Sequence, residues 1–248
     1  MNQWLHGLGQ RLALFLNQPL SRYEAFDVVG EAKLATALRP GDVLLVEGDT
    51  RIGGVIRYVT QSNWSHSALY VGNALAGDDP HMLVEADVVQ GVIASPLSKF
   101  ARLNTRICRP VGLTDADRDR LIAFVIGEIG HAYDLKNVFD LLRFYAPLPM
   151  PVRFRRRMLA FGGGDPTRAI CSTMIAQAFQ QVRYPILPRH VAGSTEEDCL
   201  KFRHYSHFTP SDFDRSPYFA IVKPTLVEGF DYKQLHWATD APPRSEED

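Results

Sequence analysis

The sequence predicts an α+β domain in which a small antiparallel sheet packs against one helix. Short apolar runs bounded by Gly, Pro and Asp recur between residues 43 and 108, and they have the length and turn chemistry of strands. Further along, Cys171 lies near the start of segment 169–179, in which large apolar side chains recur every three or four residues. This period is typical of a buried helix face. A chain of 248 residues is long enough to bury a sizeable core in such a domain.

The composition is that of an ordinary globular protein. The chain is 46% hydrophobic and 22% charged with a net charge of −1, which gives no indication of nucleic acid as a partner. Cys108, Cys171 and Cys199 are odd in number and widely spaced, so we expect no disulfide framework and a reducing compartment. No run of 18 apolar residues occurs, and no Lys or Arg precedes Arg11 as a signal peptide would require. We therefore expect a cytoplasmic protein.

Most elements of the domain can be assigned in order. We expect a helix from the capping-box pattern at Thr114 to Gly130. The stretch 55–60 fits a helix or a strand, and 21–38 resembles a further helix. The predicted strands are 43–46, 66–72, 82–86, 91–93, 105–108 and a closing strand at 218–222.

Residues 1–37 form a predicted N-terminal amphipathic helical arm ahead of a domain that spans residues 38–236. Near the start of this arm, a single helical face collects apolar side chains, namely Trp4, Leu5, Leu8, Leu12, Phe15 and Leu16. One interpretation is an arm packed on the domain or on a second subunit. The other is a helix lying on a membrane surface with Trp4 as its interfacial anchor, although Arg11 gives it only a single positive charge.

Two strand residues and one helix residue have chemistry of interest. Alternation places His66 on one face of its strand together with Ala68 and Tyr70. Glu85 lies in an otherwise apolar strand, and since a buried carboxylate is costly unless paired, we expect it to have a partner. Cys171 falls in the first helical turn, where backbone N–H groups and the helix dipole favour a thiolate. The alternative is that Cys171 is simply a small buried hydrophobic residue.

A set of short motifs follows a fixed order along the chain. From the N- to the C-terminus they are Pro40-Gly41-Asp42, Trp64-Ser65-His66, Glu85, Tyr133-Asp134 and Cys171-Ser172. This order resembles that of the permuted papain-like cysteine amidases, the YaeF/YiiX-like branch of the NlpC superfamily, in which the histidine strand precedes the cysteine. The resemblance extends over roughly residues 38 to 225. It implies a papain-like, circularly permuted NlpC-type fold.

The resemblance also implies roles for individual residues. Cys171 would be the nucleophile, His66 the base that takes the thiol proton, and Glu85 the group that orients the imidazole. Tyr133 and Ser172 would lie on the substrate or oxyanion side. Neither a metal nor a cofactor is implied. This chemistry is that of a cysteine hydrolase, an amidase or peptidase, acting through a thioester acyl-enzyme.

Two alternative functions remain open. One is a lipid-directed acyltransferase or thioesterase at a membrane surface, and the other is a non-catalytic binding module of the same fold. Accordingly, the expected partner is a small-molecule, peptide or acyl-lipid substrate. The sequence does not indicate an oligomeric state.

An arginine-rich insert at residues 139–168 bears on the first alternative. Between Arg143 and Arg168 it holds six arginines and one acidic residue, Asp165. It is predicted to be a lid or a surface for an anionic substrate or lipid, so that residues 1–18 and 141–159 would contact a membrane peripherally. The other interpretation is a solvated basic excursion.

Two further segments complete the prediction. Cys199, His204 and His207 lack a fourth ligand or a CxxC pair, so we expect no metal site there. The tail at residues 237–248 is expected to be disordered.

Overall fold

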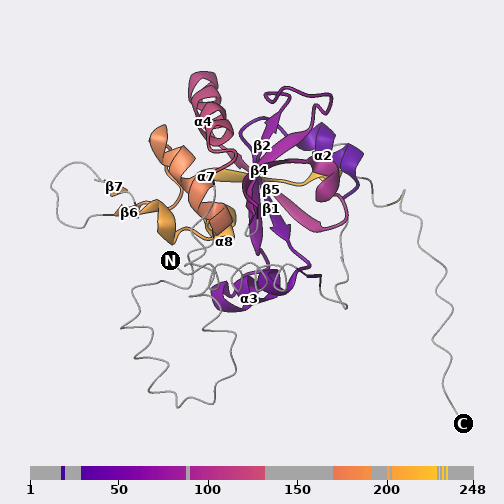
Figure 1. Ribbon diagram of the computed structural model, residues 1–248, viewed down its shortest axis with the longest axis horizontal. Coiled ribbons are helices and arrows are strands. Elements are labelled where there is room, and N and C mark those ends of the chain that lie inside the picture. Colours follow the sequence, from indigo (N-terminus) through magenta and orange to yellow (C-terminus); the bar gives the residue numbers. More distant parts are fainter. Residues whose placement is uncertain are drawn as a thin grey trace, which may run out of the picture.

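The computed structural model of the protein describes residues 18–19, 29–87, 90–131, 170–190, 200–201, 203–227, 229, 231 and 233 (Figure 1). Within these ranges, the side chains at 55, 59, 170, 171, 189, 190, 200 and 201 are not described. The predictions for residues 1–17, Tyr133, the insert 139–168 and the tail 237–248 therefore concern stretches of the chain outside the description. The division into an arm, a domain and a tail stays a prediction.

An antiparallel sheet of six strands forms the centre of the molecule, in the order β4-β3-β2-β1-β5-β8. Its strands are β1 (Val43–Glu47), β2 (His66–Gly72), β3 (Met82–Asp87), β4 (Gly91–Pro96), β5 (Asn104–Pro110) and β8 (Phe219–Val222). Each predicted strand is found, and most extend by one to three residues beyond the predicted range. A separate pair consists of β6 (Arg189–His190) and β7 (Leu200–Lys201).

Helices surround this sheet, and the mixed architecture confirms the predicted α+β class. They are α2 (Glu31–Ala37), α3 (Arg51–Thr60), α4 (Asp115–Gly127), α7 (Ile170–Gln181), α8 (Pro210–Arg215) and α9 (Pro224–Val227), with short 3-10 turns η1 (Leu97–Lys99) and η2 (Tyr205–His207). Residues 55–60, for which the sequence fitted a helix or a strand, belong to helix α3. This helix is capped at its N-terminus by Thr50, whose hydroxyl accepts from the backbone N–H of Gly53. The predicted cap of α4 is also present, since the Thr114 hydroxyl accepts from the N–H of Asp117.

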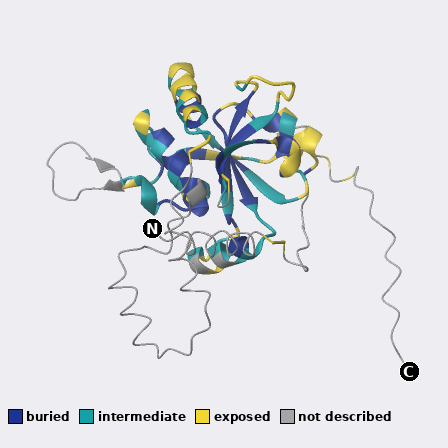
Figure 2. Ribbon diagram, viewed as in Figure 1, coloured by how far each residue is buried: buried dark blue, intermediate teal, exposed yellow. Residues whose placement is uncertain are grey.

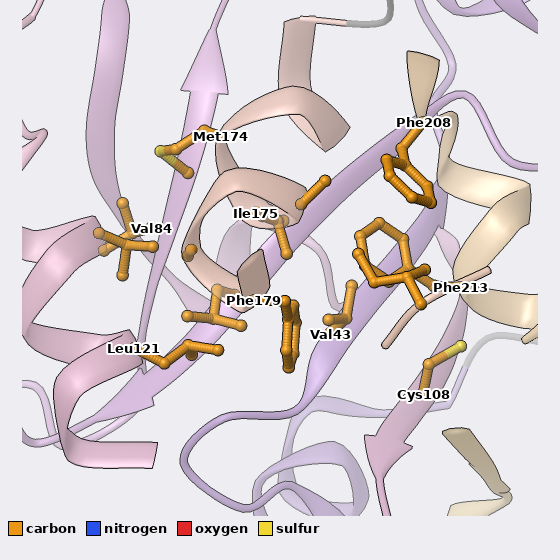
Figure 3. Packing of buried hydrophobic residues seen from close by; sticks show 14 of the residues in the cluster. Val43, Val84, Cys108, Leu121, Met174, Ile175, Phe179, Phe208 and Phe213 are labelled. Carbon is orange, nitrogen blue, oxygen red and sulfur yellow. The ribbon is translucent and has the colours of Figure 1, made fainter. Parts of the chain in front are cut away.

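The two faces of the sheet carry separate hydrophobic clusters. Val43 and Leu45 of β1 point to the face covered by α4, α7 and α8, whereas Leu44 and Val46 point to the face covered by α2 and η1 (Figures 1 and 3). Burial is correspondingly high along the strands, and the outer surfaces of α2 and α4 are exposed (Figure 2). The predicted buried face of α7 is confirmed for Met174, Ile175 and Phe179.

The direction of α7 is set by aromatic packing near its C-terminal end. The Phe179 ring meets the Phe219 ring edge-on at 5.2 Å between centroids, and Phe219 pairs with Pro110 at the last position of β5. This is the end of the sheet where β1 begins and β2 ends. Cys171 lies eight residues before Phe179, which corresponds to about 12 Å along the helix. In β2, His66 lies three residues before Leu69, which corresponds to about 10 Å along the strand. From these lengths we infer that the first turn of α7 is directed toward the end where β2 begins.

Two hydrogen bonds support the same placement. The Ser172 hydroxyl, in the first turn of α7, donates to the backbone carbonyl of Phe208 at 2.6 Å, just before α8. At the other end of α8, the Asp214 carboxylate accepts from the Trp64 indole N–H at 3.1 Å. Because Trp64 is two residues ahead of His66, α8 bridges the first turn of α7 to the start of β2.

Candidate active site

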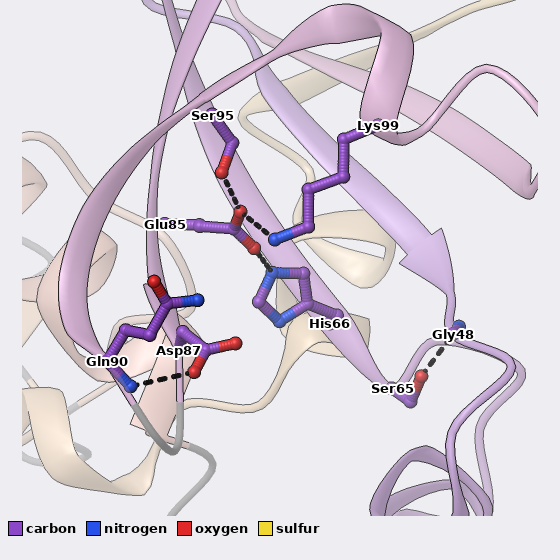
Figure 4. A network of polar contacts seen from close by, with 8 residues as sticks. All are labelled: Gly48, Ser65, His66, Glu85, Asp87, Gln90, Ser95 and Lys99. Carbon is purple, nitrogen blue, oxygen red and sulfur yellow. Dashed lines mark hydrogen bonds and ion pairs between the residues drawn. The ribbon is translucent and has the colours of Figure 1, made fainter. Parts of the chain in front are cut away.

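The centre of the candidate site is a pair of residues on neighbouring strands. His66 opens β2, and Glu85 lies in β3 opposite Ala68, so the two side chains approach each other diagonally on one face of the sheet. Nε2 of His66 and Oε2 of Glu85 are 2.6 Å apart (Figure 4). The Glu85 side chain is 2% exposed and that of His66 is 23% exposed. His66 also stacks on the Phe100 ring at 6.3 Å between centroids.

Glu85 has two further partners, and both bind its other oxygen. The hydroxyl of Ser95 in β4 donates to Oε1, and the ammonium of Lys99 in η1 lies 2.5 Å from the same atom (Figure 4). Ser95 pairs with Leu83, two residues before Glu85, so the strand register brings the hydroxyl to the carboxylate. The expectation that Glu85 is paired is thus confirmed. Ser95 and Lys99 were not singled out from the sequence.

These partners determine the charge of Glu85. Burial raises the pKa of the carboxyl, but the hydrogen bond and charge of His66, together with those of Lys99, outweigh burial and lower the pKa from 4.5 to about 2. Glu85 is therefore ionised at neutral pH and can only accept hydrogen bonds. We accordingly assign the proton of the neutral imidazole to Nε2 of His66, which leaves Nδ1 as the basic nitrogen.

The remaining predicted site residues are less completely placed. Cys171 is the second residue of α7, which confirms that it opens this helix, but its side chain is outside the described set. Ser172 is described, and its buried hydroxyl is engaged by the Phe208 carbonyl. The structure thus brings His66 and Glu85 together and directs the first turn of α7 to the same end of the sheet. The apolar residues of α7 pack on the face opposite to Glu85.

Comparison with known proteins identifies the fold. Residues 37–145 match the family described as permuted papain-like amidase enzyme, YaeF/YiiX, C92 family. The resemblance to the permuted papain-like amidases is confirmed. The α+β architecture is consistent with the permuted papain-like fold, and the match supports a hydrolase of the amidase or peptidase type in general terms. The matched segment contains His66, Glu85 and Tyr133 and ends before Cys171.

One solved structure resembles this chain. The crystal structure of metalloprotein yiiX from Escherichia coli O157:H7 is similar with a TM-score of 0.47 and 14% sequence identity, over 75% of this chain and 97% of that chain. No curated protein matches.

Other predictions concern residues outside this candidate site. Cys108 is fully buried in the core, and burial raises the pKa of its thiol. Among the described residues, no three His, Cys, Asp or Glu side chains are grouped as metal ligands would be. Within the same ranges, no helix is both long and apolar enough to span a membrane.

Proposed function

We propose that this protein is a cysteine hydrolase that cleaves an amide bond through a thioester on Cys171, with His66 as the general base and Glu85 as the residue that orients it. The observation that carries the proposal is the His66–Glu85 pair at the start of β2. It lies at the end of the sheet toward which the first turn of α7 is directed. A helix start also favours a thiolate through its free N–H groups and dipole.

The hydrogen bond to Glu85 suits His66 to this reaction. Because Nε2 donates to Glu85, Nδ1 is the atom that removes the proton from the Cys171 thiol. The thiolate attacks the substrate carbonyl, and backbone N–H groups at the start of α7 are suited to hold the resulting oxyanion. Nδ1–H then protonates the departing amine, which leaves a thioester on Cys171. Water finally attacks the thioester while Nδ1 takes its proton; the C–S bond breaks, the carboxylic acid leaves, and Nδ1–H returns its proton to the Cys171 sulfur.

The ionised state of Glu85 assists both steps. Each time Nδ1 takes a proton the imidazole becomes an imidazolium, and an adjacent buried carboxylate stabilises that charge. The same carboxylate keeps the ring oriented, because its neighbours are fixed on β4 and η1. In this mechanism Glu85 never needs to accept a proton, in agreement with its pKa of about 2.

Acylation by activated substrates tests the proposal. The protein is mixed with short peptide amides, acyl esters and acyl thioesters, and the mass of the trapped acyl-enzyme is measured. We expect one acyl group on Cys171, none on Cys171→Ala, and a rate lowered about 10²- to 10⁴-fold in His66→Ala. The exposed His131 provides a matched control, His131→Ala, which should acylate at the normal rate.

Two results would contradict the proposal. One is unchanged labelling of Cys171→Ala, and the other is a normal rate in His66→Ala. The substrate panel also separates amide cleavage from ester or thioester cleavage. An added amine or alcohol shows whether water is the natural acceptor of the acyl group.

A further inference from the structure

The two oxygens of Glu85 have different partners, and this asymmetry has a structural cause. Oε2 faces only the imidazole of His66 among the contacts of the described residues, whereas Oε1 receives the Ser95 hydroxyl and the Lys99 ammonium (Figure 4). A carboxylate attached to a flexible side chain turns easily about its last torsion. The two oxygens of an unbound carboxylate are equivalent, so the donors on Oε1 act by fixing the plane of the carboxylate and with it the direction in which Oε2 faces His66.

Both donors are held by rigid elements of the fold. Ser95 belongs to β4, whose register with β3 is continuous from Met82 to Asp87. Lys99 belongs to η1, the turn that follows β4 directly. This turn is anchored by the buried side chains of Leu97 and Phe100 and by the bond from the Leu97 N–H to the His81 carbonyl at 2.9 Å. Lys99 also lies over the Phe100 ring at 5.6 Å.

The charges around Glu85 explain why a cation is needed at this position. Asp87 follows two residues later on the same face of β3, so this face of the strand carries a second carboxylate (Figure 4). Its Oδ1 accepts from the Gln90 N–H at 2.9 Å. Lys99, with a 41% exposed side chain, reaches the 2% exposed Glu85 and supplies the compensating positive charge.

We propose that Lys99, assisted by Ser95, is a positioning residue that holds Glu85 by Oε1 so that Oε2 selects the His66 tautomer protonated on Nε2. The inference deepens the proposed function and rests on it, since this tautomer matters only if Nδ1 is the base for Cys171. Neither residue touches the substrate in this scheme. Their effect reaches the reaction through the orientation of the imidazole.

Nuclear magnetic resonance of the histidine ring tests the inference without requiring turnover. The full-length Cys171→Ala protein is labelled with ¹⁵N-histidine, and His66→Gln identifies the His66 signals. We expect the Nε2–H pattern in the parent protein and a mixture of both tautomers in Lys99→Met. Lys99→Arg should restore the parent pattern, because a guanidinium can also donate to Oε1. The exposed Lys223 gives the control Lys223→Met, with an unchanged spectrum.

Kinetics in the active protein give the second readout. Lys99→Met should lower the rate of acylation of Cys171 about 10-fold with an unchanged KM, and Ser95→Ala should do so to a smaller extent. A parent-like tautomer in Lys99→Met, or a parent-like rate, would overturn the inference. If Cys171 is never acylated while Lys99→Met still changes the tautomer, the proposed function fails and the positioning of the ring by Lys99 is upheld.

Discussion

Asp42 and Glu85 are two buried carboxylates of the same sheet with opposite electrostatics. Asp42 is 1% exposed and precedes β1, where it accepts from the Arg39 N–H and from the Arg109 guanidinium at 2.7 Å. Burial raises the pKa of Asp42 and outweighs Arg109, whereas His66 and Lys99 outweigh burial at Glu85 and lower its pKa to about 2. A salt bridge by itself therefore does not reveal the role of a buried carboxylate.

The difference lies in the partners. Arg109 keeps its charge at any ordinary pH and also donates to the Ala37 carbonyl at 2.6 Å, so Asp42 joins the end of α2, the turn at Gly41 and β5. Gly41 has φ +93° in this turn, a conformation that favours glycine. Glu85 is paired instead with an imidazole, which gains and loses a proton near neutral pH. The first pair is suited to holding structure and the second to proton transfer.

The largest contrast is expected in activity. Glu85→Gln should lower the rate of Cys171 acylation about 10²-fold, because a neutral amide no longer stabilises the imidazolium. The rate of Cys171 acylation in Asp42→Asn should stay within a few-fold of the rate in the parent protein, since Asp42 does not contact His66. Single-turnover acylation at neutral pH measures both. An equally large loss in Asp42→Asn would break the comparison.

In stability, a substitution at Asp42 should have a larger effect than one at Glu85. Asp42→Ala leaves the largely buried Arg109 without its carboxylate, so we expect a loss of about 3 kcal/mol in the free energy of unfolding. Glu85→Gln should cost less, because the amide keeps an oxygen that can still accept from Ser95 or Lys99, whereas alanine leaves Arg109 with no side-chain acceptor at position 42. Urea unfolding of both variants measures the difference. A greater loss in Glu85→Gln would show that the Glu85 network is the main structural tie.

The dependence of stability on pH sharpens the contrast further. The pKa of Glu85 is lowered on folding, so its stabilisation is complete above pH 4.5 and is lost as the pH falls toward 2. The pKa of Asp42 is raised on folding, so its contribution is complete below 3.8 and is lost as the pH rises through the folded value. Urea unfolding at a series of pH values gives the free energy of unfolding as a function of pH. At acidic pH this free energy should rise less steeply with pH in Glu85→Gln than in the parent protein, and more steeply in Asp42→Asn. The same slope in all three proteins would refute the assignment.

The smallest expected effect is at Ser67, the neighbour of His66 on the opposite face of β2. Its hydroxyl is fully buried and has no hydrogen-bond partner among the described residues, so Ser67→Ala should stabilise the fold by about 1 kcal/mol. Ser95→Ala is the matched comparison and should destabilise it, because the Ser95 hydroxyl has a partner in Glu85. Thermal unfolding of the two variants distinguishes them. Destabilisation of Ser67→Ala would mean that its hydroxyl is satisfied.

The sequence predicts the elements of this molecule that depend on local pattern. Alternation in β2 and β3 and the cap at Thr114 give the correct strands and helix, and alternation also places His66 on the face of Ala68 and Tyr70. The α3 segment was ambiguous because its β-branched residues suit a strand as well as a helix. Its helix starts from Thr50, whose capping bond becomes visible only in the fold.

The candidate site was predictable only to a limited extent, for a related reason. Glu85 is an isolated charge in an apolar strand, and such a charge indicates that a partner exists. Ser95 and Lys99 carry no comparable signal, because a serine in an edge strand and a lysine in a turn are ordinary surface residues. It is the register of β3 with β4, followed by the turn η1, that brings them to Oε1.

The aromatic packing at the end of α7 has a consequence for distant substitutions. Phe179 is enclosed by Tyr184, Phe213 and Phe219, whose centroids lie 5.2 to 6.2 Å from its own. A helix is stiff, so these rings fix the C-terminal end of α7, while Cys171 lies about 12 Å along the helix in the first turn, which the Ser172–Phe208 hydrogen bond also holds. A smaller side chain at Phe219 would let α7 tilt. In the proposed mechanism, changes in this cluster would thus misalign the Cys171 sulfur and the His66 imidazole without altering either residue.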